Sequence, residues 1–112
     1  MADRMRRVNE AVREVVSARL AEGLGDPRIG FVTVTSVETS PDLRHARVYV
    51  SVLGDEAARA ETLTGLESAH GVIQQALARD LRMKHTPALQ FVWDESIDRG
   101  MRITEILEGE EE

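Results

Sequence analysis

The sequence predicts an α+β domain in which helices cover one face of a small mixed sheet. Two observations carry this prediction. Apolar residues recur every three or four positions across 3–22 and again across 56–83, which is typical of amphipathic helices. Three runs, at 29–38, 43–53 and 88–93, are rich in β-branched or aromatic residues, as strands are. The order helix, strand, strand, helix, strand in 112 residues favours a single domain.

The first helix is predicted over residues 3–22 by a single apolar stripe. Its end is marked by Gly23 and Gly25, which favour a C-terminal stop, and by Pro27, which cannot continue a helix. The stripe consists of Met5, Val8, Val12, Val15, Val16 and Leu20. We therefore expect this helix to pack on the sheet by one face.

The strands at 29–38 and 43–53 are expected to pair antiparallel. The segment Thr39-Ser40-Pro41-Asp42 between them has the residue types of a turn. In the second strand the small and apolar positions are Ala46, Val48, Val50 and Val52, and they alternate with polar or aromatic ones. This alternation predicts a sheet with one covered face.

A glycine interrupts the second predicted helix, which spans about 56–83. The apolar rhythm continues through Gly71, although a glycine inside a helix costs about 1 kcal/mol relative to alanine. Such a residue needs a packing or functional reason. We therefore predict a kink at Ala69-His70-Gly71.

The third strand is predicted over 88–93, after Thr86-Pro87 ends the helix. Because a helix lies between them, the second and third strands should be parallel if they are adjacent. A last short helical turn is expected around 97–107. Residues 108–112 are nearly all glutamate and are predicted to form a disordered acidic tail, so the domain itself should span 1–107.

Composition and spacing argue against an enzyme. There is no cysteine, and His45, His70 and His85 lack the spacing of metal ligands on a helix. Asp94, Glu95 and Asp98 form an acidic cluster that could bind a cation but is better explained as helix capping. No phosphate-binding glycine motif is present. We predict no catalytic residue, no metal and no cofactor.

The location expected from the sequence is the cytoplasm. The N-terminus leads into charged residues with no apolar block, so no secretory segment is predicted. No apolar run approaches the roughly 18 residues of a membrane span.

Basic residues gather in two places despite a net charge of −6. Five glutamates lie within residues 105–112 without a basic neighbour, so the rest of the chain is nearly neutral. The candidate RNA-binding residues are Arg4, Arg6 and Arg7 at the start of the first helix, and Arg79, Arg82, Lys84 and His85 at the end of the second. Arginines in a first helical turn oppose the helix dipole, and phosphate is a natural reason for them. An exposed polar face explains either cluster equally well in isolation.

His70 has two interpretations. In a straight helix its side chain would lie within the apolar stripe, as a half-buried histidine. If Gly71 bends the chain, His70 turns outward beside a backbone that nucleic acid can approach closely. We therefore include His70 and Gly71 among the candidate RNA-binding residues.

Several motifs resemble the ribosome-binding factor A family over nearly the whole chain. The most specific stretch is Ser40-Pro41-Asp42-Leu43 followed by residues 46–51, and Ala69-His70-Gly71 matches the family's Ala-x-Gly kink. The other matching segments are Arg7-Val8, Asp26-Pro27-Arg28, Val32-Thr33-Val34-Thr35, Val37, Leu81-Arg82-Met83-Lys84, Pro87-Ala88-Leu89, Phe91, Asp94, Ser96 and Gly100-Met101-Arg102-Ile103.

This resemblance implies a type II KH-like domain without enzymatic activity. It implies binding to the immature small ribosomal subunit through its rRNA, a role in late rRNA processing and cold adaptation, and a functional link to a ribosome-associated GTPase. It is consistent with a monomer.

Gln74-Gln75 and Asp80 stand where many members are more basic, and Ala88 where an acid is usual. The N-terminal arginines would then carry more of the RNA contact. The alternative is a protein-interaction module that docks a partner through its sheet without binding RNA.

Overall fold

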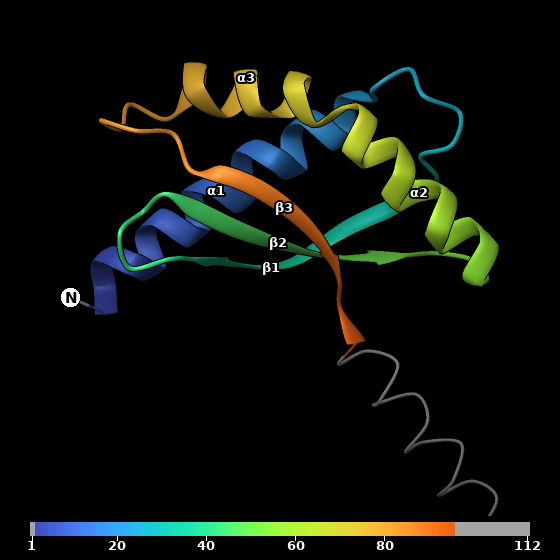
Figure 1. Cartoon of the computed structure of the whole chain (residues 1–112), viewed down its shortest axis with the longest axis horizontal. Coiled ribbons are helices and arrows are strands. Elements are labelled where there is room, and N and C mark those ends of the chain that lie inside the picture. Colours follow the sequence, from blue (N-terminus) through green and yellow to red (C-terminus); the bar gives the residue numbers. More distant parts are fainter. Residues whose placement is uncertain (1, 96–112) are drawn as a thin grey trace, which may run out of the picture.

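The computed structural model describes residues 2–95, so the predicted helical turn around 97–107 and the acidic tail at 108–112 lie outside the described residues. The elements follow the predicted order (Figure 1). They are α1 (Ala2–Glu22), β1 (Val32–Thr39), β2 (His45–Val52), α2 (Glu56–Ser68), α3 (His70–Asp80) and β3 (Ala88–Trp93). The predicted third strand matches β3 in both bounds, whereas β1 and β2 begin two or three residues later than expected.

The three strands form one mixed sheet in the order β1-β2-β3. β1 and β2 are antiparallel, with Val32 opposite Val52, and a bulge interrupts the ladder between Val34 and Ser36. β2 and β3 are parallel, with His45 opposite Ala88. The antiparallel hairpin and the parallel crossover pair are both as predicted.

All three helices cover the same face of the sheet, and the opposite face is left open by the described residues (Figure 1). The buried core lies between these two layers and includes residues of α1, of the kinked helix and of all three strands. Its members are Val12, Val16, Val34, Val37, Ala46, Val48, Val50, Leu66, Ile73, Leu77 and Leu89. The apolar stripes of the sequence therefore converge as expected.

The helix break falls at Ala69, two residues before the glycine that suggested it. Ala69 has φ −86° and ψ 2°, so it leaves the helical region for one residue. Its N–H donates to Gly65 O at 2.9 Å and its carbonyl accepts from Ile73 N–H at 3.1 Å. The chain therefore bends without losing these two hydrogen bonds. The prediction of helix as far as residue 83 is wrong, because α3 ends at Asp80 and Leu81 is extended.

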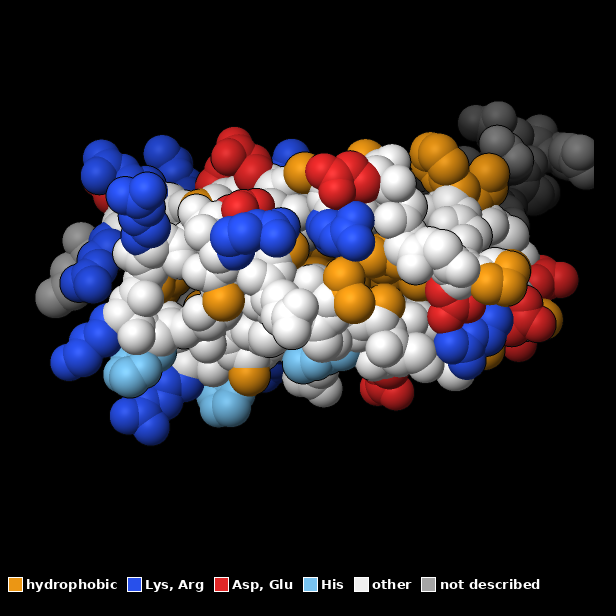
Figure 2. All heavy atoms as spheres, turned by 90° about the horizontal axis from the view of Figure 1, so that it is seen from above, with side chains coloured by type: hydrophobic (Ala, Val, Ile, Leu, Met, Phe, Trp, Pro, Cys, Tyr) orange, Lys and Arg blue, Asp and Glu red, His pale blue; other side chains and the backbone are white. Residues whose placement is uncertain are grey.

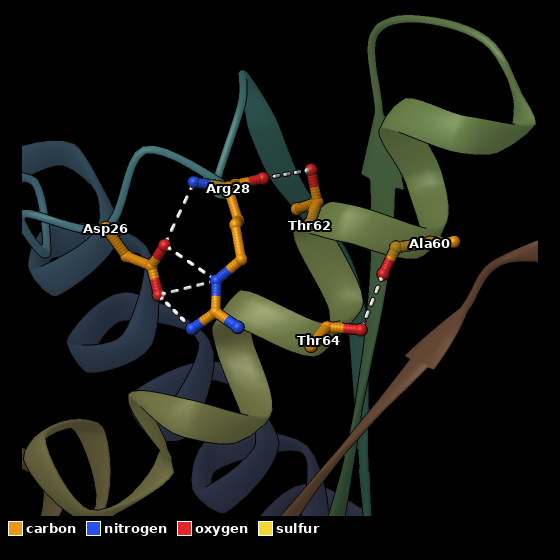
Figure 3. Close-up of polar contacts among 5 residues, drawn as sticks. All are labelled: Asp26, Arg28, Ala60, Thr62 and Thr64. Carbon is orange, nitrogen blue, oxygen red and sulfur yellow. Dashed lines mark hydrogen bonds and ion pairs between the residues drawn. The ribbon is translucent and has the colours of Figure 1, made fainter.

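Gly65 fixes how closely α2 approaches the loop before β1. A Cβ at this position would lie 2.6 Å from Ile29 Cγ1 and 3.4 Å from Arg28 Cβ. One turn earlier, the Thr62 hydroxyl accepts from Gly30 N–H at 3.3 Å and donates to the Arg28 carbonyl at 3.4 Å (Figure 3). This contact holds α2 against the loop, while α3 follows β3.

The same loop is closed by an ion pair between Asp26 and Arg28 (Figure 3). Arg28 Nη2 lies 2.6 Å from Asp26 Oδ2, and the Arg28 backbone N–H donates to Asp26 Oδ1 at 2.9 Å. The hydrogen bonds from the Arg28 side chain and backbone lower the pKa of Asp26 to about 2. The carboxylate is therefore more stable in the folded protein than in the unfolded chain.

We expect this pair to make stability depend on acid pH. A lowered carboxyl pKa contributes stability that is complete above about pH 4 and is lost as the pH falls towards 2. The melting temperature of the unmodified protein should thus fall more steeply over this range than that of Asp26→Asn. The exposed Glu61, which makes no hydrogen bond or ion pair with residues 2–95, provides the control Glu61→Gln, which should keep the original slope. Equal slopes for the unmodified protein and Asp26→Asn would contradict this assignment.

Side chains from the helices cover part of both outer edges of the sheet. On β3, Gln74 Nε2 donates to Pro87 O at 2.6 Å, and its Oε1 accepts from Leu89 N–H at 3.1 Å. His70 Nε2 lies 2.9 Å from Leu89 O, so this nitrogen is the protonated one. On β1, Asn9 Oδ1 accepts from Thr39 N–H at 2.9 Å. These contacts satisfy backbone groups that a neighbouring strand would otherwise bind.

Candidate nucleic-acid interface

The first predicted cluster lies on the opening turns of α1. Arg4, Arg6 and Arg7 are exposed, and none of them forms an ion pair with another described residue. Their positive charges are therefore not neutralised within residues 2–95. Because the N-terminus of a helix already carries partial positive charge, the three arginines add to a local field that attracts anions.

The second predicted cluster lies at the end of α3 and in the connection that follows it. Arg79, Arg82, Lys84 and His85 are all exposed. Arg79 Nε lies 3.5 Å from Asp80 Oδ1, so its charge is partly balanced. Arg82, Lys84 and His85 lie in the irregular segment after Asp80, and neither Arg82 nor Lys84 has an ion-pair partner in the described part of the chain.

Two cationic or titratable groups that were not predicted as RNA-binding lie beside these clusters: Arg44 in the β1–β2 turn and His45, the first residue of β2. Both are exposed. The turn is held by the Asp42 carboxylate, which accepts from the Ser40 hydroxyl at 2.6 Å and from Arg44 N–H at 3.0 Å. These two hydrogen bonds lower the pKa of Asp42. Leu43 takes the left-handed conformation, with φ 62°, which completes the turn.

These three segments meet at one end of the molecule. The start of α1, the β1–β2 turn and the α3–β3 connection all lie at the left of Figure 1. Viewed onto the helices, the same end gathers most of the Lys, Arg and His side chains in that view (Figure 2). We call this surface the basic end. It consists of Arg4, Arg6, Arg7, Arg44, His45, Arg79, Arg82, Lys84 and His85.

His70 and Gly71 lie at the kink, on α3 rather than within the basic end. The half-buried His70 imidazole is bonded to the Leu89 carbonyl, so it holds α3 against β3. Of its two interpretations, the inward one describes the structure. Gly71 is exposed, and a Cβ added there would have no atom within 4 Å. The first turn of α3 therefore presents bare backbone to the outside.

Gln74 is a structural residue that the sequence reasoning missed. The sequence marks it only as a departure from a more basic pattern. Its carboxamide instead pairs with the β3 backbone as a peptide group of a neighbouring strand would. A polar residue one turn after His70, on the face that packs towards β3, is the pattern that could have revealed it.

The structure gives the acidic cluster no support as a metal site. The Thr35 hydroxyl lies 2.6 Å from Asp94 Oδ2, which ties the end of β3 to the bulge in β1. Asp98 lies outside the described residues. Across residues 2–95, no group of three His, Asp or Glu side chains is arranged to hold a metal ion.

In the same part of the chain, no helix is both long and apolar enough to cross a membrane.

Comparisons with known proteins identify one family. A family model described as "Ribosome-binding factor A" matches residues 4–107. The chain is 53% identical to ribosome-binding factor A of Anaeromyxobacter dehalogenans over 106 residues, which cover 94% of this chain and 77% of that protein.

Solved structures agree with this match. The crystal structure of ribosome-binding factor A from Thermus thermophilus superposes with a TM-score of 0.71 and 28% identity, covering 80% of this chain and 93% of that one. A Thermus thermophilus homology model fitted into the cryo-EM map of a 30S–RbfA complex gives a TM-score of 0.58 and 31% identity. It covers 82% of this chain and 92% of that one.

Proposed function

Because the chain belongs to the ribosome-binding factor A family, we propose that it binds the immature small ribosomal subunit through its rRNA and supports late maturation of that rRNA. The family consists of ribosome-binding factors rather than enzymes, so the prediction of a non-enzymatic protein is confirmed. The predicted fold class, a KH-like α+β domain, is confirmed as well. The small subunit as partner is supported by the neighbour fitted to a 30S complex.

The observation that carries the RNA-binding proposal is the basic end. Phosphate contacts from Lys and Arg supply most sequence-independent affinity for nucleic acids, because each one releases condensed counterions. Here such side chains come from three separate segments that the fold brings together, and Arg4, Arg6, Arg7, Arg82 and Lys84 have no ion-pair partner within residues 2–95. A surface of this kind fits a folded rRNA, whose phosphates approach from several directions.

Cellular location, oligomeric state and the detailed role in ribosome assembly are proposed from the family alone. We propose that the protein acts in the cytoplasm as a monomer, supports rRNA processing and growth in the cold, and is functionally linked to a ribosome-associated GTPase. These roles need no cofactor.

Co-sedimentation with purified subunits tests the proposal directly. The protein should bind precursor small subunits more tightly than mature ones, and the binding should weaken steeply with added salt. Naked rRNA should compete for the same sites. Binding that is unaffected by salt and by naked rRNA would favour the alternative, a protein-interaction module that does not contact RNA.

We expect Gly71→Ala to separate folding from binding. Alanine in place of an exposed helical glycine should stabilise the protein by about 0.5–1 kcal/mol, since the added Cβ meets no atom. If rRNA approaches the bare backbone at Gly71, the same methyl group should weaken binding to precursor subunits. Urea unfolding and co-sedimentation measure the two effects. A variant that is more stable and binds as well as the unmodified protein would remove Gly71 from the interface.

A further inference from the structure

The edge of β1 near its start is left open by the described residues. The bonds from Gln74 and His70 cover β3 near Leu89, and Asn9 covers β1 at Thr39. At the other end of the hairpin, Leu53 N–H donates to Phe31 O at 3.1 Å. By the alternation of an antiparallel ladder, the N–H and C=O groups of Val32 and Val34 then point away from β2. Neither residue has a side-chain partner for these groups within residues 2–95.

A groove runs along this open edge. It has a volume of about 340 Å³ and lies between β1 and the C-terminal half of α1, where Ser17, Leu20 and Ala21 form its other wall. Phe31, one of its lining residues, is 74% exposed, and Leu53, which is paired with Phe31 across the hairpin, is 79% exposed. Unpaired backbone groups next to exposed apolar side chains are what a domain offers when it binds an extended peptide by strand addition.

The charge beside the groove favours a basic occupant over RNA. The arginines of this half are engaged within the protein: Arg19 pairs with Glu22, Arg28 pairs with Asp26, and Arg59 stacks on Trp93 at 3.8 Å. The exposed carboxylate of Glu14 has no partner among residues 2–95. Glu14 is one turn from Ser17 on the same side of α1. Phosphates would be repelled here, whereas lysine and arginine side chains would be attracted.

We propose that the groove binds a basic, extended protein segment, which adds as a strand to β1 at Val32–Val34. Apolar side chains of that segment would pack on Phe31 and in the groove, while its cations would face Glu14. The groove lies away from the basic end, so a protein segment and rRNA can be held at the same time. The inference rests on the proposed function only in placing the natural partner on the small subunit.

A synthetic peptide tests the groove without the ribosome. The probe is an acetylated hexapeptide of alternating lysine and valine, titrated into the isotope-labelled full chain and followed by NMR. The backbone amides of Val32 and Val34 should shift and become protected from solvent exchange. The matched peptide with glutamate in place of lysine should bind at least tenfold more weakly. Shifts confined to the basic end or to β3, or no shift at millimolar peptide, would overturn the proposal.

Binding of three variants to small subunits tests whether the groove has a partner there. Phe31→Lys removes the apolar contact and repels a basic segment, and Val32→Pro removes an outward N–H that the domain itself does not use. Each should weaken binding to small subunits about tenfold, as loss of a central interface contact does, and leave binding to naked rRNA unchanged. Ala60→Lys adds the same charge on α2, away from the groove, and should change neither. If Phe31→Lys and Val32→Pro both bind subunits as Ala60→Lys does, the groove has no partner there. Failure of the RNA proposal would appear instead in the unmodified protein with naked rRNA.

Discussion

Gly65→Val should destabilise the folded protein by about 3 kcal/mol. The first atom of any side chain at this position would lie 2.6 Å from Ile29 Cγ1, so α2 must move away from the loop or Ile29 must leave its place. Overpacking of a closed contact typically costs about 1–3 kcal/mol, and valine adds two further methyl groups. Displacing α2 would also break the Thr62 hydrogen bonds to Gly30 and Arg28. Urea unfolding measures the change.

Gly71→Val is the matched control, because it makes the same substitution in the same kinked helix. A Cβ at Gly71 meets no atom within 4 Å, so only helix propensity changes and stability should stay within about 0.5 kcal/mol. Since about 1 kcal/mol corresponds to roughly 4–8 °C in a domain of this size, the two variants should differ clearly in melting temperature. Equal losses for both would mean that α2 does not depend on close approach at Gly65.

Neutralising the basic end should cause the largest loss of ribosome binding. Replacing Arg6, Arg7, Arg82 and Lys84 together by glutamine removes four cations from two segments. If all four contact phosphate, affinity for precursor subunits should fall on the order of 100-fold at moderate salt, and the slope of log K against log salt should shrink by about three to four units. The loss should be largely independent of RNA sequence, because phosphate contacts position rather than specify.

The pairwise variants show which segment matters. Arg6→Gln with Arg7→Gln should reduce the slope by about two units, and so should Arg82→Gln with Lys84→Gln. Arg13→Gln with Arg19→Gln removes the same charge from side chains that pair with Glu10 and Glu22, and should leave the slope unchanged. An unchanged slope for either basic-end pair would take those residues out of the interface. The single variant Arg82→Ala applies the same criterion to one residue.

The fold was largely predictable because each element carries its own pattern. The stripe from Met5 to Leu20 and the alternation from Ala46 to Val52 both record burial on one side, and the structure buries Val12, Val16, Val48 and Val50 completely. The crossover between β2 and β3 followed from element order alone. The helix end was misplaced by three residues, because Leu81 continues the apolar rhythm although its backbone is extended.

The kink was predicted at Ala69-His70-Gly71, and the break falls at the first of these residues, but the physical reason for it was not predicted. A glycine breaks the pattern visibly, so Gly71 drew the prediction, whereas the bend at Ala69 results from packing α2 on the loop and α3 along β3. Gly65 was overlooked because the neighbour it touches, Ile29, is distant in sequence. Contacts of this kind depend on tertiary structure and leave no local periodicity.

The candidate site was predictable residue by residue but not as a surface. Charge alone identified the cations of the start of α1 and the end of α3, yet nothing in their spacing showed that the two clusters share one end, or that the β1–β2 turn joins them. His70 was ambiguous for a physical reason. Its ring fits either a polar surface or a single backbone acceptor, and only the position of Leu89 O decides between them.

Because Gln74 bonds the Leu89 N–H, hydrogen exchange of this amide measures whether α3 is in contact with β3. The Leu89 N–H points away from β2, where an edge amide would ordinarily exchange with solvent quickly, but it is bonded to Gln74. Its exchange with deuterium should therefore be slow and should follow the lifting of α3 rather than the fraying of β3. In Gln74→Ala this amide should exchange at the rate of an open edge. In the unmodified protein, slower exchange at Leu89 on addition of small subunits would show that α3 separates from β3 less often when the subunit is bound.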